Sequence, residues 1–170
     1  MKKLFFLFLF LPITVLAQEP TFKKGIPDDL DKEKIIFLEH EPIKVTAREK
    51  SKKAEKYLYE RQTNHNKVLN ESNQILNGAA LAYPFEYAIT TPSTYLALAK
   101  AGYKYVLQSS VYNYDHLTGQ PTEDELTVFG YYIFDMENNI AYEVFHLDEM
   151  KVYDFKLIIK KLNKAINAAK

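Results

Sequence analysis

The 170-residue chain has no cysteine, no tryptophan and only five glycines. Without cysteine it can form no disulfide, no thiolate metal site, no thiol nucleophile and no lipidated N-terminal cysteine. No two glycines have the spacing of a phosphate-binding or dinucleotide-binding loop, which excludes both motifs. An excess of one charge is also missing, because 22 Lys and Arg balance 22 Asp and Glu. A chain with zero net charge does not have the composition of a general nucleic-acid binder.

The first 17 residues have the pattern of a secretion signal. Lys2 and Lys3 supply the positive end, an apolar stretch follows, and small residues precede a cleavage site between Ala17 and Gln18. The apolar stretch is shorter than the about 20 residues that a membrane-spanning helix needs. We therefore expect cleavage and export, to the periplasm or outside a bacterial cell, rather than an N-terminal anchor.

The mature chain is short enough to be a single domain. Residues 18–33 contain two prolines, a glycine and an Asp-Asp pair, and we interpret them as a flexible lead-in. Residues 34–170 are predicted to form one α/β domain. A domain of this size can fold on its hydrophobic core alone, without a metal or a disulfide.

Hydrophobic periodicity predicts alternating strands and helices along this domain. The predicted strands lie at 35–38, 85–90, 103–114, 126–135 and 140–147, and the predicted helices at 46–79, 91–101 and 155–169. The early strand–helix alternation favours parallel pairing, and the late hairpin favours antiparallel pairing. We predict a fold of α/β to α+β class, with a single mixed sheet in the order β-α-β-α-β-β-β-α and helices packed on it.

Several residues suggest where these elements begin and end. Thr46 and Glu49 have the spacing of a capping box, which places the start of the long helix at Thr46. A Thr-Pro pair opens the second helix, and Gly102 suits the left-handed position after it. Asp148 or Asp154 could cap the last helix.

Charge is segregated along the chain. Residues 44–67 hold eight Lys or Arg and three Glu, residues 105–150 hold nine Asp or Glu and no basic residue, and residues 151–170 hold six Lys and one Asp. This pattern is open to three interpretations: basic helices that lie near acidic loops of the same molecule, a basic face for an anionic envelope surface, or opposite charges that meet between copies.

Some acidic and histidine residues have the chemistry of metal ligands. They are Asp115, His116, His146, Asp148 and Glu149. A divalent metal needs three or four such groups converging on one point, and no His-x-x-x-His spacing joins these. We interpret them as exposed strand ends and caps, and we predict neither a metal nor a cofactor.

The residue types of a hydrolase triad also occur together, at Ser109, Ser110, Asp115 and His116. The Gly-x-Ser-x-Gly turn of such enzymes is absent. Neighbouring residues such as Asp115 and His116 point to opposite sides of a strand. We therefore predict a protein that is not an enzyme. A small hydrolase that uses carboxylates, His116 or His146 remains the alternative, because catalytic carboxylates meet only in space.

Tyrosine is the most distinctive component, with 13 residues that lie mostly on predicted strands. Tyr is well suited to the half-buried surface of a sheet, and packing is the simpler explanation. An exposed aromatic platform for a peptide or glycan is the functional one. The candidate binding surface consists of Tyr112, Tyr114, Tyr131 and Tyr132, of which the last two should take opposite faces.

The stretch Ala101-Gly102-Tyr103-Lys104-Tyr105-Val106-Leu107, followed by Ser109 and Ser110, resembles a recurring pattern in one group of envelope domains. That group includes the N-terminal α/β domain of the Tol-system propeller protein and the curli-secretion lipoproteins. There an apolar strand, a short helix, an Ala-Gly-x-x-Tyr-type strand and a hairpin lead to a closing helix. The last half of this chain follows the same order, with its hairpin at Phe134-Asp135 and Asn138-Asn139.

The chain differs from that group in three ways: it has no lipidation cysteine, its hairpin lacks the Thr-Gly pair, and it has a long basic helix. The resemblance implies an envelope-associated interaction domain without catalysis and transfers no functional residue. We therefore expect an exported binding protein whose partner is an envelope protein or a glycan, not a nucleic acid. A self-associating structural protein is a further alternative.

Overall fold

The structure is a computed structural model that describes residues 19–48, 52–111, 114–115, 120–121, 128–149 and 151–169. It contains one six-stranded sheet with the order β1-β8-β7-β4-β2-β3. The strands of this sheet are β1 (Thr21–Lys24), β2 (Ile35–Leu38), β3 (Tyr87–Thr90), β4 (Tyr105–Val111), β7 (Val128–Asp135) and β8 (Ile140–Asp148). Two further strands, β5 (Tyr114–Asp115) and β6 (Gln120–Pro121), pair with each other.

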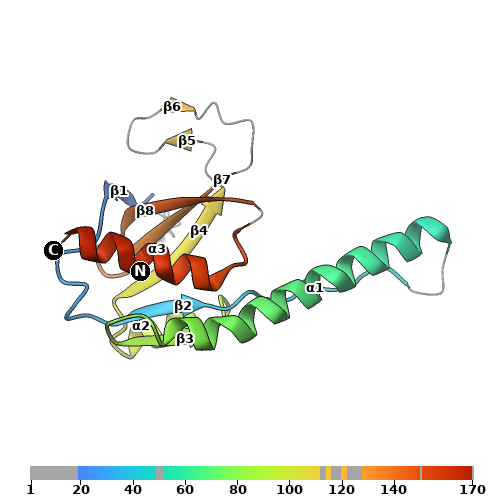
Figure 1. The fold of residues 1–170 in the computed structure, drawn as a ribbon, viewed down its shortest axis with the longest axis horizontal. Coiled ribbons are helices and arrows are strands. Elements are labelled where there is room, and N and C mark those ends of the chain that lie inside the picture. Colours follow the sequence, from blue (N-terminus) through green and yellow to red (C-terminus); the bar gives the residue numbers. More distant parts are fainter. Residues whose placement is uncertain are drawn as a thin grey trace, which may run out of the picture.

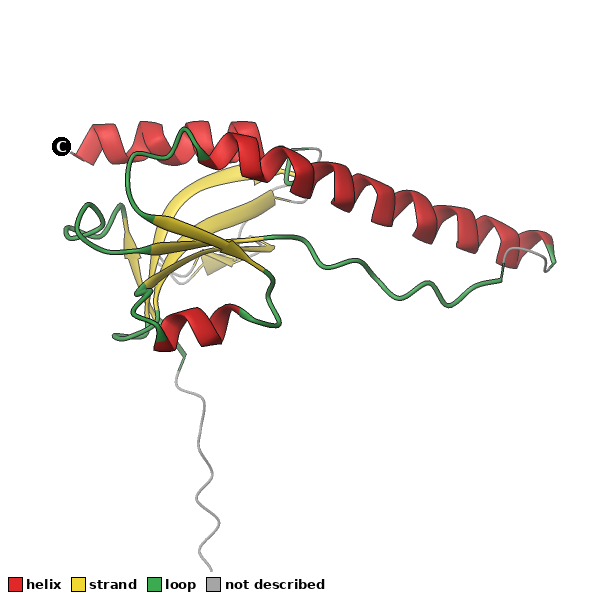
Figure 2. Cartoon of the chain, turned by 90° about the horizontal axis from the view of Figure 1, so that it is seen from below, coloured by secondary structure: helices red, strands yellow, loops and turns green. Residues whose placement is uncertain are grey.

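Three helices cover the sheet. The long helix α1 (Lys53–Ala80) and the closing helix α3 (Phe155–Ala169) pack together on one face, and the short helix α2 (Tyr95–Lys100) lies on the other (Figure 2). This arrangement confirms the predicted single mixed sheet with helices packed on it. None of the described helices is long and apolar enough to cross a membrane.

The pairing of the strands also follows the prediction. β2 pairs in parallel with both β3 and β4. β4 with β7 and β7 with β8 form antiparallel pairs. The edge strand β1, which runs parallel to β8, is an addition to the predicted strands and lies within the segment interpreted as a flexible lead-in.

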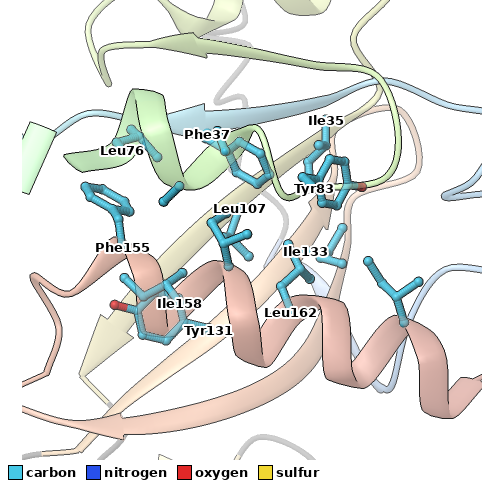
Figure 3. Close-up of a cluster of buried hydrophobic side chains, with 14 of the residues drawn as sticks. Ile35, Phe37, Leu76, Tyr83, Leu107, Tyr131, Ile133, Phe155, Ile158 and Leu162 are labelled. Carbon is cyan, nitrogen blue, oxygen red and sulfur yellow. The ribbon is translucent and has the colours of Figure 1, made fainter. Parts of the chain in front are cut away.

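The main core lies between the sheet and the pair α1–α3 (Figure 3). Strand residues such as Phe37 and Ile133 meet Leu76 of α1 and Ile158 and Leu162 of α3, all with 1% exposure or less. Fully burying one such side chain contributes roughly 1.5–3 kcal/mol, so this layer can hold the domain together without a disulfide.

The N-terminal half of α1 extends beyond the sheet as an arm (Figure 1). The extended segment 39–48 continues outward from β2 and lies alongside α1, which runs in the opposite direction (Figures 1 and 2). We call this segment the strap. Most of the strap and most of the outer half of α1 are exposed, as the weak apolar pattern of the first half of the helix predicts.

Side-chain amides of α1 hold the strap by its backbone. Asn73 accepts from the N–H of His40 at 2.8 Å and donates to the carbonyl of the same residue at 2.9 Å. Asn66 makes the same pair of bonds to Ile43, at 2.8 and 2.9 Å. Further out, Gln62 accepts from the N–H of Thr46 at 3.1 Å. Each amide thus replaces a neighbouring strand as the partner of the extended backbone.

The lengths of the strap and the helix match. From Asn73 to Glu55, whose carboxylate accepts from the N–H of Arg48 at 3.2 Å, α1 rises about 27 Å at about 1.5 Å per residue. From His40 to Arg48 an extended chain covers about 26 Å at about 3.3 Å per residue. The two can therefore stay in register along the arm.

Two predicted helix starts are wrong. α1 begins at Lys53 instead of Thr46. Thr46 lies in the strap, where its backbone N–H and its hydroxyl bond to the side chain of Gln62 on α1. The predicted second helix begins at Tyr95, after a turn in which the carbonyl of Thr91 accepts from Tyr95 at 3.1 Å.

The remaining end signals are confirmed. Asp154 caps α3 by accepting from the N–H of Leu157 at 3.1 Å. Gly102 has φ 89° after α2, and Asn139 has φ 54° in the hairpin turn between β7 and β8. Both are left-handed conformations, which glycine and asparagine adopt most easily.

Candidate functional site

A cavity of about 470 Å³ lies where the strap, α1 and the sheet meet. This volume falls within the range of small-molecule pockets. Its wall consists of Phe37, Leu38, Glu39, His40, Glu41, Ile43, His65, Leu69, Pro92, Tyr95, Leu107, Gln108, Ser109, Tyr131, Tyr153, Phe155, Ile158 and Ile159. Of these, Phe37, Leu107 and Phe155 are among the residues labelled in Figure 3.

The topology of the sheet explains why the cavity lies here. The chain leaves β2 toward α1 on one face and leaves the neighbouring strand β3 toward α2 on the opposite face (Figure 2). Two loops that diverge in this way leave a crevice at the carboxyl ends of their strands, where ligands of α/β proteins bind. Glu39 and Glu41 follow β2, and Pro92 follows β3.

His40 is held in one place at the cavity wall. Its backbone has both hydrogen bonds to Asn73. Its ring lies 5.2 Å from the ring of Tyr153 at an edge-on angle and 5.1 Å from the ring of Phe155. His65, from α1, approaches the same Tyr153 at 6.0 Å. The two histidines, which are far apart in the sequence, therefore share one aromatic partner.

His40 is mainly neutral near pH 7. Burial of the imidazole lowers the pKa of His40, and the nearby His65 lowers it further. Nε2 of His40 is buried and has no hydrogen-bond partner among the described residues. A charged ring in that position would be poorly solvated, so the neutral form is favoured.

Among the described residues of the cavity wall, Glu39 and Glu41 are the only Asp, Glu, Lys or Arg. Glu41 accepts from the N–H of Ser93 at 3.0 Å, and hydrogen bonds from the hydroxyl and N–H of Ser93 lower the pKa of Glu41. Glu39 is half-buried, and its carboxylate has no hydrogen bond or ion pair to another described residue. The cavity therefore has negative charge at its rim.

The inner wall carries hydroxyl groups. Tyr131 donates to the carbonyl of Val152 at 3.1 Å, and burial raises the pKa of Tyr131 well above its usual range. Ser109 lies opposite Tyr131 in the β4–β7 pair. Neither His40 nor His65 forms a hydrogen bond to Ser109 in the described structure, so these residues do not form a nucleophile–base pair.

Of the four tyrosines of the predicted binding surface, the structure describes the side chains of Tyr131 and Tyr132. Tyr131 faces α3 and Tyr132 faces the opposite side, as predicted, but they are only 4% and 5% exposed. Tyr112 and the side chain of Tyr114 lie outside the described residues. Of the two described side chains, Tyr131 lines the cavity, whereas Tyr132 packs edge-on against Phe22 at 5.8 Å.

One predicted histidine has an acidic neighbour that the candidate residues did not include. His146 Nε2 lies 3.6 Å from Glu143 Oε1, and the Glu143 side chain is only 8% exposed. A β-bulge explains this contact. Tyr131 faces Phe145 but Tyr132 faces Glu143, so Val144 is skipped in the pairing. On a regular strand, Glu143 and His146 would point to opposite faces, because they are three residues apart. The bulge at Val144 brings both side chains to the same face of β8.

Among the candidates that the structure describes, none forms a metal-binding group of three with this pair. Asp148 forms an ion pair with Lys151 at 2.5 Å. Ser110 lies on the opposite side of β4 from Ser109 because the two are adjacent on a strand. His116 and the side chain of Asp115 lie outside the described residues. Within the described ranges, no group of three or more His, Asp or Glu side chains could hold a metal ion.

His40, His65, Glu39 and Glu41 were not among the residues singled out by sequence. A weak signal exists, since 39–41 directly follow a buried strand whose connection leads into a helix. His65 lies on a stretch of α1 that gives no such signal. No family model, curated protein or solved structure matches the chain.

Proposed function

We propose that the protein is an exported bacterial binding protein that acts without catalysis and takes a small ligand into the cavity between the strap and the sheet. The observation that carries this proposal is the cavity of about 470 Å³ at the carboxyl ends of β2 and β3. Export is supported by the leader pattern over residues 1–17.

The composition of the wall supports binding. Aromatic and aliphatic side chains from β2, β4, α1 and α3 surround the space, and a few polar groups lie at its rim and at one end. Ligand pockets generally combine a large apolar surface with a small number of fixed polar groups. His40 is one such fixed group, since its backbone and ring are both packed.

The absence of a nucleophile–base hydrogen bond among Ser109, His40 and His65 supports a role without catalysis. For a catalytic proton transfer, the donor and acceptor heavy atoms lie about 2.6–3.2 Å apart. His146 and Glu143 have the right residue types for acid–base chemistry, but neither lines the cavity.

Binding can be tested by titrating the ¹⁵N-labelled chain from residue 18 with a library of neutral, cationic and anionic fragments. We expect amide shifts at His40, Ser109 and Tyr153 for some fragments. Ser109→Trp should abolish these shifts, because Ser109 lines the cavity. The matched control is Ser110→Trp, which adds the same ring on the opposite side of β4. A library that shifts none of these amides, or shifts them equally in both variants, would refute the proposal.

A further inference from the structure

We infer that the ligand of this cavity is a small organic cation, a protonated primary amine carried on an aromatic or apolar body. This inference rests on the proposed binding function and adds the chemical class of the ligand. It follows from the charges at the rim, the rings in the wall and the comparison with anionic or neutral ligands.

The charge of the wall is of one sign. None of the described Lys and Arg residues lines the cavity, whereas Glu39 and Glu41 do. Glu39 is a half-buried residue whose carboxylate has no partner among the described residues, so it has free acceptor sites for an ammonium group. Glu41 has spare acceptor capacity beside its bond to Ser93.

The rings of the wall suit the same ligand. Phe37, Tyr95, Tyr131, Tyr153 and Phe155 line the cavity. An aromatic ring attracts a cation within about 6 Å of its face and also packs against an apolar body. A ligand with an ammonium group at the rim and an apolar body inside would meet both kinds of surface.

An anionic ligand is disfavoured, because it would bring a further negative charge next to Glu39 and Glu41, with no Lys or Arg among the described residues of the wall. A neutral ligand would cover the Glu39 carboxylate without replacing its water, which is costly for a charged group.

The test uses three probes with the same ring and nearly the same size: phenethylamine, phenethyl alcohol and phenylacetate. Calorimetry on the full chain from residue 18 should give an affinity for the amine at least about tenfold higher than for the alcohol, as expected for a hydrogen bond to a charged group. Phenylacetate should bind more weakly than the alcohol.

The variant Glu39→Gln should remove most of the preference for the amine, because it lowers the affinity for the amine and removes the cost that the alcohol pays for covering a charged carboxylate. Glu71→Gln is the matched control, because Glu71 lies on α1 outside the cavity wall, 3.8 Å from Lys67. It should leave all three affinities unchanged. A preference for the amine that survives Glu39→Gln would overturn the inference.

The remaining outcomes separate the inference from the proposed function. Equal or tighter binding of the alcohol or the acid overturns the cation assignment but leaves a binding cavity. Tighter binding of a lysine-bearing tetrapeptide than of phenethylamine overturns the small-molecule assignment in favour of a polypeptide side chain. If the three probes do not bind while other fragments do, the inference fails alone; if no fragment binds, the proposed function fails.

Discussion

The contribution of His40 to the free energy of unfolding depends on pH. Its ring is packed against Tyr153 and Phe155, and its Nε2 has no partner in the described structure. Burial and the nearby His65 lower the pKa of His40 below the ordinary value of 6.5. The unfolded chain therefore binds this proton more readily than the folded protein does.

We expect this histidine to make the protein less stable in mild acid. Between pH about 6.5 and the lower pKa of the folded state, the unfolded chain holds more protons, so the free energy of unfolding decreases as the pH decreases. Above about pH 6.5 the group contributes no slope. Urea unfolding at about pH 5 and about pH 7.5 measures the difference.

The variant His40→Phe isolates the effect, because phenylalanine can fill the same aromatic site and does not titrate. Its free energy of unfolding should decrease less than that of the wild type between the two pH values. Other titrating groups are common to both proteins and cancel in the comparison. An equal decrease in both proteins would show that His40 protonates as readily in the folded state as in the unfolded chain.

The strap is attached to α1 by a small number of individual hydrogen bonds. The strap has a mainly exposed surface, and amide side chains of α1 provide partners for its backbone. Elements with few buried apolar contacts open locally at a small part of the global free energy. The strap should therefore separate from α1 while the sheet and α3 stay folded.

The variant Asn66→Ala should loosen the middle of the strap. It removes two hydrogen bonds to Ile43, worth about 1–2 kcal/mol together, so exchange of the Ile43 amide hydrogen should become roughly five- to thirtyfold faster. Asn64→Ala is the control, since Asn64 is exposed and forms no bond to the strap. Amides of β4 should keep their protection in both variants. Equal exchange rates at Ile43 in the two variants would contradict the conclusion that Asn66 holds the strap.

The elements differ in how far their residues predict them. α3 and the strands β4, β7 and β8 follow from their own periodicity, because each buries one face or both against the core. The start of α1 does not. Thr46 and Glu49 satisfy a local capping rule, but the N–H of Thr46 bonds instead to Gln62, sixteen residues away. Contacts between distant residues override a local signal of about 1 kcal/mol.

The cavity could not be located from sequence for the same reason. His40 and His65 lie near each other only because α1 folds back along the strap. Asn73, which accepts from the N–H of His40, is 33 residues away in the sequence. β1 was missed because its four residues are exposed or half-buried and show no apolar alternation. The opposite faces of Tyr131 and Tyr132 follow from strand alternation, but the covering of both faces depends on tertiary packing.

At the scale of the molecule, basic charge gathers on the arm. Lys56 pairs with Glu60 and Lys67 with Glu71, each at 3.8 Å within α1. Exposed pairs of this kind contribute little to stability. Most of the basic side chains on the N-terminal half of α1 are exposed to solvent. The arm is thus a long projection whose charge differs in sign from the rim of the cavity.

The proposed export can be tested on the whole chain. Expression with the leader in a bacterial host should give a periplasmic or secreted protein that starts at Gln18, which intact-mass analysis would show. Ala17→Asp should block cleavage at this site and leave the longer, uncleaved chain. Recovery of uncleaved wild-type protein from the cytoplasm would contradict export.

The way the strap is attached has a consequence for protein engineering. Asn73, Asn66 and Gln62 grip main-chain groups, which every residue except proline offers alike. The side chains of Lys44 and Val45 between these grips are exposed. These side chains can therefore be replaced without changing the hydrogen bonds to α1. A foreign epitope introduced at this stretch would be displayed in an extended form on the same scaffold.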